Sequence, residues 1–141
     1  VKGVEALGVD VKDFGILTTP QLHFLVRQAN SGEEFSEHYY FQTLVRGYRE
    51  VMAAAPSPDG AVPRKPLVVD AANGVGAMKV KLLQDALDDA LEFDIRNDGS
   101  TGELNTLVGA DFVEKERKPP HGFDCEDLLG RRCVSLDGDA D

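Results

Sequence analysis

The stretch Leu67-Val68-Val69-Asp70-Ala71-Ala72-Asn73-Gly74-Val75-Gly76 decides the fold of this chain. It begins with a short aliphatic run, which is typical of a buried strand in a parallel sheet. The two glycines mark a tight turn, after which apolar residues return at helical spacing as far as Leu91. Residues 91–96 then alternate between apolar and charged side chains, as a second strand does. Together these segments predict a βαβ unit over 67–97 and therefore an α/β protein.

The acidic run Asp137-Gly138-Asp139-Ala140-Asp141 follows a third apolar segment, residues 133–136. We expect this segment to be a strand parallel to the other two. The acidic run then emerges beside residues 73–76, at the carboxyl edge of the sheet, where open α/β sheets bind their ligands.

The aspartates of this run have the chemistry of a metal site. Side chains alternate along an extended chain, and the small residues between the aspartates let the backbone curl, so the three carboxylates converge. Their hard oxygen atoms suit Mg²⁺ or Ca²⁺. We therefore predict that Asp137, Asp139 and Asp141 bind one divalent metal, Mg²⁺ in preference to Ca²⁺. The alternative is an acidic turn on the surface.

Gly74-x-Gly76 at a strand-to-helix turn also resembles part of a dinucleotide-binding fingerprint, and Asp94 lies where a ribose-binding acid is expected. Lys79, however, occupies the position of the third glycine. We interpret the glycines as a tight turn and expect no NAD site, while a weak anion site at the start of the following helix stays open.

The N-terminal part of the chain predicts a β-rich segment followed by a helix. Residues 1–17 are rich in strand-forming residues and contain glycines. Thr19 and Pro20 are predicted to be the N-cap and the first residue of a helix that ends at 30–32. His23 falls outside the apolar stripe of this helix, which favours a solvated or edge-packed imidazole over a ligand or a catalytic base.

Three further segments complete the chain. The apolar spacing predicts a helix over 36–54, and a proline-rich loop or linker follows at 55–66. The region 104–117 is ambiguous, and we favour a short helix around 111–117.

Composition narrows the class of protein. The 141 residues are 42% hydrophobic, enough for the core of one ordinary domain, and carry a formal net charge of -10. This charge disfavours nucleic acid or an anionic membrane as a partner, and no segment resembles a membrane span or a secretory signal. Cys125 and Cys133 lack the spacing of a zinc site or a disulfide framework. We therefore expect a cytoplasmic protein with reduced thiols.

Five runs of the sequence together resemble the α-D-phosphohexomutase superfamily. They cover nearly the whole chain in order, at 15–24, 69–79, 97–105, 109–113 and 135–141. The Asp-Gly-Asp-Ala-Asp run is similar to the metal-binding loop of the whole superfamily. The runs at 97–105 and 109–113 resemble the branch that acts on N-acetylglucosamine phosphates.

The resemblance implies a three-layer α/β/α fold with a mostly parallel sheet, like domain 2 of these four-domain enzymes. Residues 1–33 would be the C-terminal part of domain 1, and residues 34–141 would be domain 2, carrying the metal-binding loop. By the same match Asp137, Asp139 and Asp141 hold Mg²⁺. The chain contains no Ser-His-Asn run, so the catalytic phosphoserine, together with the sugar-binding and phosphate-binding loops, is expected outside it.

The implied reaction is phosphoryl transfer within one sugar. The phosphoserine converts N-acetylglucosamine 6-phosphate to a sugar bisphosphate and then takes back the other phosphate, leaving the 1-phosphate for UDP-N-acetylglucosamine synthesis. The implied partners are a phosphorylated amino sugar and the remaining domains of the same enzyme, with no nucleic acid and no membrane. The isolated chain is expected to be inactive.

Another phosphohexomutase is one alternative to this activity, and three further alternatives come from other classes of protein. A haloacid-dehalogenase-like phosphatase also places Asp-x-Asp after an apolar strand, but it commonly has Thr or Val where this chain has Asp141. An EF-hand-like calcium module needs a helix before its loop, and the apolar strand-like segment stands there instead. A non-catalytic metal-binding or interaction domain is the third.

Overall fold

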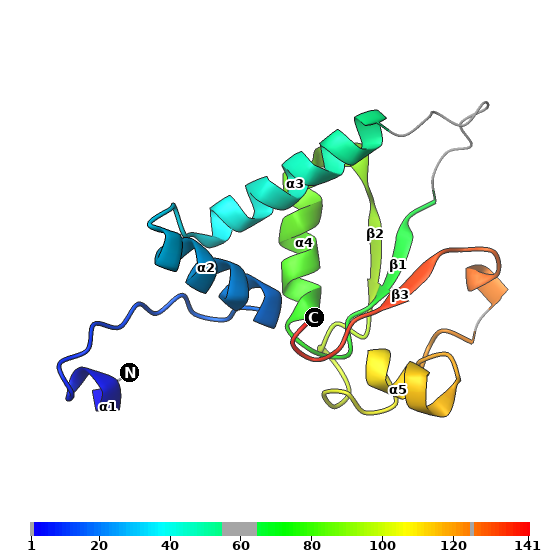
Figure 1. Ribbon diagram of the computed structural model, residues 1–141. Coiled ribbons are helices and arrows are strands. Elements are labelled where there is room, and N and C mark those ends of the chain that lie inside the picture. Colours follow the sequence, from blue (N-terminus) through cyan, green and yellow to red (C-terminus); the bar gives the residue numbers. More distant parts are fainter. Residues whose placement is uncertain (1, 55–64, 125) are drawn as a thin grey trace.

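The computed structural model describes residues 2–54, 65–124 and 126–141. In chain order its elements are α1 (Lys2–Glu5), α2 (Thr19–Ser31), α3 (Glu37–Ala54), β1 (Leu67–Asp70), α4 (Gly76–Leu87), the 3-10 helix η1 (Asp88–Ala90), β2 (Phe93–Arg96), α5 (Ala110–Glu116), the 3-10 helix η2 (Glu126–Leu128) and β3 (Cys133–Ser135) (Figure 1). None of the helices in these residues combines the length and the apolar character that a membrane span requires.

A parallel sheet of three strands, in the order β2-β1-β3, forms the centre of the described structure. Val69 of β1 pairs with Ile95 of β2 and with Val134 of β3. The predicted βαβ unit is therefore confirmed, and so is the prediction that the strand before the acidic run lies parallel in the same sheet. Because β1 is the middle strand, Val68 and Val69 are completely buried, with 0% and 2% of their surface exposed.

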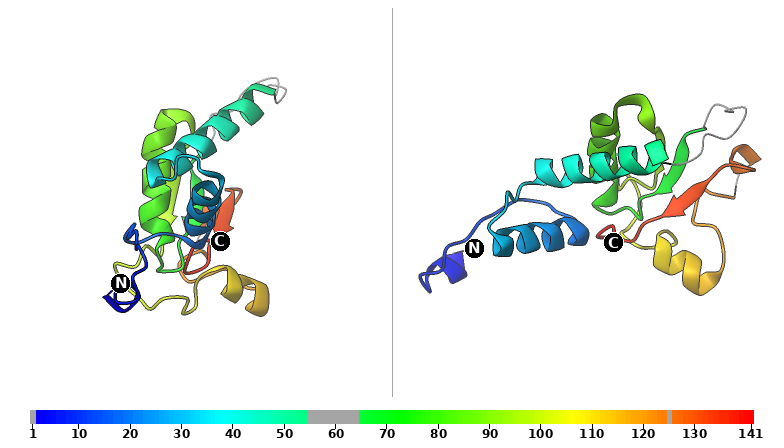
Figure 2. Two further views of the ribbon diagram at one scale, coloured as in Figure 1. Left: turned by 60° about the vertical axis from the view of Figure 1, so that its left-hand side comes forward. Right: turned by 45° about the horizontal axis from the view of Figure 1, so that its top comes forward.

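Helical layers cover both faces of this sheet. On one face Val68 packs against Phe123 and Leu128, which belong to the segment between α5 and β3. Strand alternation turns Val69 to the other face, where α4 lies; α3 packs on α4, and α2 packs on α3. Figures 1 and 2 show α4 and α5 on opposite sides of the strands. The predicted three-layer α/β/α class is confirmed.

The predicted N-cap of α2 is wrong by one residue, because Thr18 caps the helix instead of Thr19. The hydroxyl of Thr18 accepts a hydrogen bond from the Gln21 amide at 3.2 Å, and the Gln21 side chain accepts one from the Thr18 amide at 3.0 Å. This reciprocal capping box satisfies two amide groups that have no partner within the helix. The helix ends, as predicted, at Gly32, whose φ of 69° is left-handed.

The prediction of β-structure in the N-terminal segment is wrong for residues 2–17. Apart from α1, this segment has no regular structure, and no strand of the described chain pairs with it. It extends away from the sheet and touches the α2–α3 connection, where the Lys12 ammonium lies 4.1 Å from the centroid of the Phe35 ring (Figure 1). Strand-forming residues produce a strand only where a neighbouring strand completes the hydrogen-bonded ladder.

The remaining elements follow the sequence closely. The helix predicted over 36–54 is α3, and the short helix predicted around 111–117 is α5. The second strand begins at Phe93 instead of Leu91, because η1 carries the helical connection further along the chain. Most of the predicted proline-rich linker, residues 55–64, lies outside the described residues.

A buried carboxylate joins the loops at the carboxyl edge of the sheet. Asp70 ends β1 and has none of its surface exposed. Its Oδ1 accepts hydrogen bonds from the Asn97 side chain at 2.8 Å and from the Ala72 amide at 3.2 Å. Its Oδ2 accepts from the Gly109 amide at 2.8 Å. Asn97 follows β2 and Gly109 precedes α5, so one side chain holds three loops in place.

We expect Asp70→Asn to lower the free energy of unfolding by about 1–3 kcal/mol, because the new NH₂ group would face a donor and leave one buried amide unpaired. The measurement is the midpoint of urea unfolding. Asp10→Asn, on the exposed N-terminal segment, is the matched control and should stay within about 0.5 kcal/mol of the unchanged protein. Equal midpoints for the two variants would contradict the role given to Asp70.

Candidate metal centre

The three aspartates of the acidic run lie together in space, as the sequence predicts. One carboxylate oxygen from each of Asp137, Asp139 and Asp141 lies within 4.8 Å of the others. A turn produces this arrangement: the Ala140 amide donates to the Asp137 carbonyl at 3.2 Å, and Ala140 itself has a left-handed φ of 61°. The Asp141 amide donates to Asp137 Oδ1 at 3.1 Å. The curled backbone, more than strand alternation, brings the oxygens together.

Hydrogen bonds and neighbouring charges shift the pKa values of two of these aspartates in opposite directions. The pKa of Asp141 is raised, because its protonated form can hydrogen-bond to Asp137 and because the charges of Asp137 and Asp139 oppose its ionisation. The pKa of Asp139 is lowered, chiefly because the Thr19 hydroxyl donates a hydrogen bond to its carboxylate. The charges of Asp137 and Asp139 thus oppose the ionisation of Asp141, and a divalent cation among the three would relieve this opposition.

This donor set fits Mg²⁺ or Ca²⁺. Carboxylate oxygens are the ligands that both cations prefer, and Asp139 and Asp141 are exposed enough to be reached from solvent. Three protein oxygens leave further coordination positions for water or phosphate oxygens, which Mg²⁺ commonly keeps. That the three residues bind a metal stays a prediction.

The acidic run is seated against the first βα turn through an unusually close backbone approach. The Val75 amide donates to the Gly138 carbonyl at 3.1 Å. A Cβ atom on Gly74 would lie 2.3 Å from that carbonyl oxygen and 2.8 Å from the Gly138 Cα, so no side chain fits there. On the other side, a Cβ on Gly138 would lie 2.8 Å from Asn105 Nδ2. The acidic run thus emerges beside residues 73–76, as predicted.

The glycines of the first βα turn therefore allow the acidic run to approach this turn closely. A Cβ on Gly76 would lie 2.8 Å from the Leu136 side chain, directly before the acidic run. Lys79, which stands at the third fingerprint position, is buried and pairs with Glu37 at 2.5 Å. The interpretation of the two glycines as a tight turn agrees with this geometry.

Asn73 attaches the loop at 97–105 to the first βα turn, beside the acidic run. Its Oδ1 accepts from the Gly99 amide at 3.3 Å, its Nδ2 donates to the Glu103 carbonyl at 3.1 Å, and its own amide donates to the Asn97 carbonyl at 2.7 Å. Ala72 and Asn73 both have left-handed φ values, 55° and 54°, which turn the chain sharply after β1. No local pattern in the sequence indicates this attachment. The structure places it against the acidic run.

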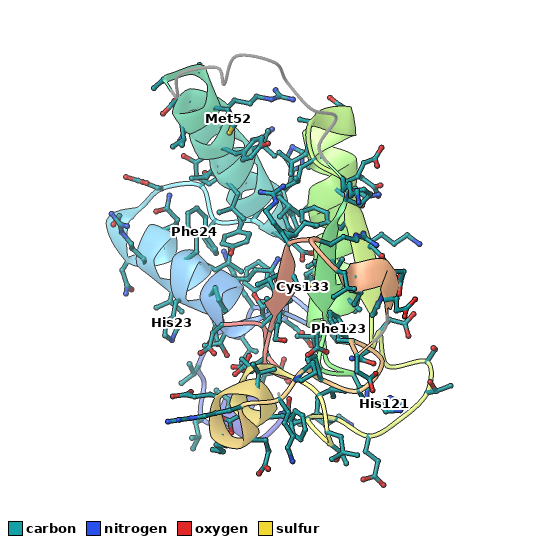
Figure 3. The ribbon with its side chains drawn as sticks, turned by 90° about the vertical axis from the view of Figure 1, so that its right-hand side faces the viewer. His23, Phe24, Met52, His121, Phe123 and Cys133 are labelled. Atoms are coloured by element: carbon teal, nitrogen blue, oxygen red, sulfur yellow. The ribbon has the colours of Figure 1, made fainter. Side chains whose placement is uncertain are left out.

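The first turn of α2 also reaches the candidate centre, which the sequence does not predict. The Thr19 amide donates to the Asp139 carbonyl at 3.2 Å, and the Thr19 hydroxyl donates to Asp139 Oδ2. One turn further along α2 lies His23, which Figure 3 labels. Its charge lowers the pKa of Asp141 and so acts against the causes that raise it. His23 is thus exposed, as predicted, but it does have an acidic neighbour. That neighbour is 118 residues away in the sequence (141 − 23), so no local spacing reveals it.

A buried polar network fixes the position of α2. Glu37 Oε1 accepts from the Gln21 side chain at 2.9 Å and from Lys79 Nζ at 2.5 Å. These residues belong to α2, α3 and α4, and Gln21 and Lys79 have only 1% and 7% of their surface exposed. Aromatic contacts of Phe24 with Tyr39 and Tyr40 add to the α2–α3 packing (Figure 3). The start of α2 is therefore held firmly beside the acidic run.

Comparison with known proteins agrees with this geometry. No protein-family model matches the chain. Phosphoacetylglucosamine mutase from Oryza sativa subsp. japonica is 44% identical over 144 residues, covering 100% of this chain and 25% of that protein. The Arabidopsis thaliana enzyme of the same name is 47% identical, with coverages of 96% and 24%, and the Homo sapiens enzyme is 41% identical, with coverages of 100% and 26%.

Solved structures give the same result. N-acetylphosphoglucosamine mutase from Aspergillus fumigatus, in complex with GlcNAc-6P and magnesium, superposes with a TM-score of 0.80 at 35% identity, covering 98% of this chain and 28% of that one. An apo-form N-acetylglucosamine-phosphate mutase, described as a member of the α-D-phosphohexomutase superfamily, superposes with a TM-score of 0.75 at 30% identity, with coverages of 92% and 27%.

The chain is therefore similar, over almost its whole length, to one part of the enzymes of the α-D-phosphohexomutase superfamily. The relatives that it matches within this superfamily are phosphoacetylglucosamine mutases, and the chain spans about a quarter of their length.

We expect Gly74→Ala to destabilise the protein by about 1–3 kcal/mol, because the added methyl group meets backbone atoms that cannot turn away. Gly47→Ala is the matched control: it lies within α3, and nothing is found within 4 Å of an added Cβ. This control should stabilise by about 0.5–1 kcal/mol, as Ala does in a helix. Urea unfolding compares the two, and a Gly74→Ala protein as stable as the Gly47→Ala protein would show that the close approach is not a constraint.

Proposed function

We propose that this chain forms the metal-binding part of a phosphoacetylglucosamine mutase, an isomerase that interconverts N-acetylglucosamine 6-phosphate and N-acetylglucosamine 1-phosphate. The observation that carries the proposal is the convergence of three carboxylates on one turn at the carboxyl edge of a parallel sheet. Relatives of that name at 41–47% identity over almost the whole chain support it.

Asp137, Asp139 and Asp141 are the residues that would hold Mg²⁺. Magnesium, when bound, neutralises charge on the transferring phosphoryl oxygens and orients them. The Aspergillus fumigatus enzyme in complex with GlcNAc-6P and magnesium supports this choice of cation and of a phosphorylated amino sugar as substrate. The cation also resolves a conflict of charge, because three unneutralised aspartates would repel an anionic sugar phosphate.

The task of this chain is to hold three oxygen ligands at a fixed place. The turn at Asp137–Ala140 brings them together, and the contact of Gly74 with Gly138 fixes the height of the turn above the sheet. Phosphoryl transfer relies mainly on positioning and on charge stabilisation, so a rigid seat for the ligands is a direct contribution to the reaction.

The other parts of the active site are proposed to lie outside this chain. We assign residues 1–33 to the C-terminal part of domain 1 and residues 34–141 to domain 2 of a four-domain enzyme. The phosphoserine that donates the phosphoryl group comes from the rest of domain 1, the sugar-binding loop from domain 3 and the phosphate-binding loop from domain 4. The whole enzyme would be a cytoplasmic phosphoprotein that supplies the sugar 1-phosphate for UDP-N-acetylglucosamine biosynthesis, with no nucleic acid or membrane partner.

A coupled assay for N-acetylglucosamine 1-phosphate tests the proposal. The whole enzyme and the isolated 141-residue chain are compared with a sugar bisphosphate and Mg²⁺ supplied. The whole enzyme should turn over, and the isolated chain should be silent because it lacks the donor serine. Turnover by the isolated chain at about a few per cent of the rate of the whole enzyme would show that the phosphoryl donor is not a serine outside this chain. Silence of both proteins would refute the proposed activity.

In the whole enzyme we expect Asp139→Ala to lower turnover more than about 100-fold, because a direct ligand contributes more than an outer-shell partner. The fold should survive, since Asp139 is exposed. Steady-state rates at several Mg²⁺ concentrations, together with a thermal unfolding curve, measure both effects. Asp10→Ala serves as the control for loss of one negative charge. Near-normal activity of Asp139→Ala with added Mg²⁺ would remove Asp139 from the metal site.

A further inference from the structure

We propose that Thr19 is a positioning residue for the metal centre, whose hydroxyl fixes the orientation of the Asp139 carboxylate. The proposal rests on the proposed function, because it requires that Asp139 be a metal ligand. Thr19 contacts Asp139 twice: its hydroxyl donates to Oδ2, and its amide donates to the Asp139 carbonyl at 3.2 Å.

The hydroxyl of Thr19 is not needed by the helix that carries it. Thr18 is the N-cap and forms the complete capping box with Gln21. Two adjacent threonines therefore have separate tasks, the first in starting α2 and the second in contacting the acidic run. A purely structural threonine at this position would have its hydroxyl directed to the helix amides, as that of Thr18 is.

Within the part of the chain that the structure describes, no side chain from outside the acidic run hydrogen-bonds to Asp137 or Asp141. Asp137 Oδ1 is held by the Asp141 amide within the run itself. Asp139 is exposed, and among the described residues outside the run it is Thr19 whose side chain donates a hydrogen bond to it. An exposed carboxylate without such a bond samples several rotamers, and ordering it costs free energy when a ligand binds.

Thr19 is suited to this task because its own position is rigid. Gln21, two residues further on, is buried and bonded to Glu37, which is bonded in turn to Lys79. The hydroxyl is therefore presented by a helix that is packed on α3 and anchored to α4. Figure 1 shows the first turn of α2 beside the C-terminal end of the chain and the start of α4.

The hydrogen bond is compatible with a bound cation. A carboxylate has two oxygens and about four lone-pair directions, so Oδ2 can accept from Thr19 while the group still coordinates a metal. Such outer-shell hydrogen bonds orient metal ligands, and their loss typically weakens metal affinity by about 10–100-fold. This is the size of effect that the structure assigns to the Thr19 hydroxyl.

The experiment measures Mg²⁺ affinity in the whole enzyme by isothermal titration calorimetry for Thr19→Val, Thr19→Ser and the matched control Thr106→Val. Thr106 is exposed and has only long hydroxyl contacts, of 3.4 and 3.5 Å. We expect the Kd for Mg²⁺ to rise about 10–100-fold in Thr19→Val and to stay near its original value in Thr19→Ser and Thr106→Val.

A second readout separates positioning from folding. The metal-free unfolding temperature of Thr19→Val should match that of Thr106→Val, and kcat at saturating Mg²⁺ should recover while the Mg²⁺ concentration for half-maximal rate stays raised. If Thr19→Val does not fold, Thr19→Ala makes the same test, because Ala also lacks the hydroxyl and favours helix.

Each outcome decides the proposal. Unchanged Mg²⁺ affinity in Thr19→Val, with normal binding by the original enzyme, overturns the role of Thr19 and leaves the proposed metal site intact. Affinity lost equally in Thr19→Ser assigns the effect to shape instead of to the hydroxyl, and also overturns it. An original enzyme that binds no Mg²⁺ refutes the metal site itself, and the role of Thr19 with it.

Discussion

The burial of the Asp70 carboxylate is the constraint on which the carboxyl edge of the sheet depends. A charge removed from water is costly unless hydrogen bonds replace its hydration, and the three donors come from three separate loops. The backbone carbonyl of the same residue accepts from the Leu136 amide at 2.9 Å, one residue before Asp137. The Ala110 amide in turn donates to the Leu136 carbonyl at 2.9 Å. Satisfying one buried charge therefore fixes the loops around the acidic run and also the point where that run begins.

The acidic run combines electrostatic repulsion with tight packing. The pKa of Asp141 is raised by its hydrogen bond with Asp137 and by the charges of Asp137 and Asp139. The backbone beneath these carboxylates has little room to move, because Gly138 is confined between Gly74 and Asn105. If the backbone cannot move the three carboxylates apart, a proton or a bound cation is needed to reduce their repulsion. In the proposed metal site, the rigid backbone and the negative potential would together favour a divalent cation.

Contacts between α2 and the acidic run join two segments that are 120 positions apart in the sequence. The Gln21–Glu37–Lys79 network sets the height of α2 on α3 and α4, and Thr19 then meets Asp139. If residues 1–33 belong to a first domain and the acidic run to a second, the interface between these domains lies beside the proposed metal. The position of one domain then affects the geometry of a ligand on the other.

The sequence by itself determined the βαβ unit, α3, α5 and the grouping of the three aspartates, because each follows from a local period or spacing. The choice between Thr18 and Thr19 as N-cap is also local, since only Thr18 has a glutamine three residues later. The strand-like residues at 2–17 gave a wrong prediction because a strand needs a partner that no local pattern specifies. Only the tertiary structure decided that Gly74 meets Gly138 and that Thr19 meets Asp139, residues 120 positions apart. These contacts arise where three parallel strands end at one edge and α2 packs back against it, so their cause is the fold and not the neighbouring sequence.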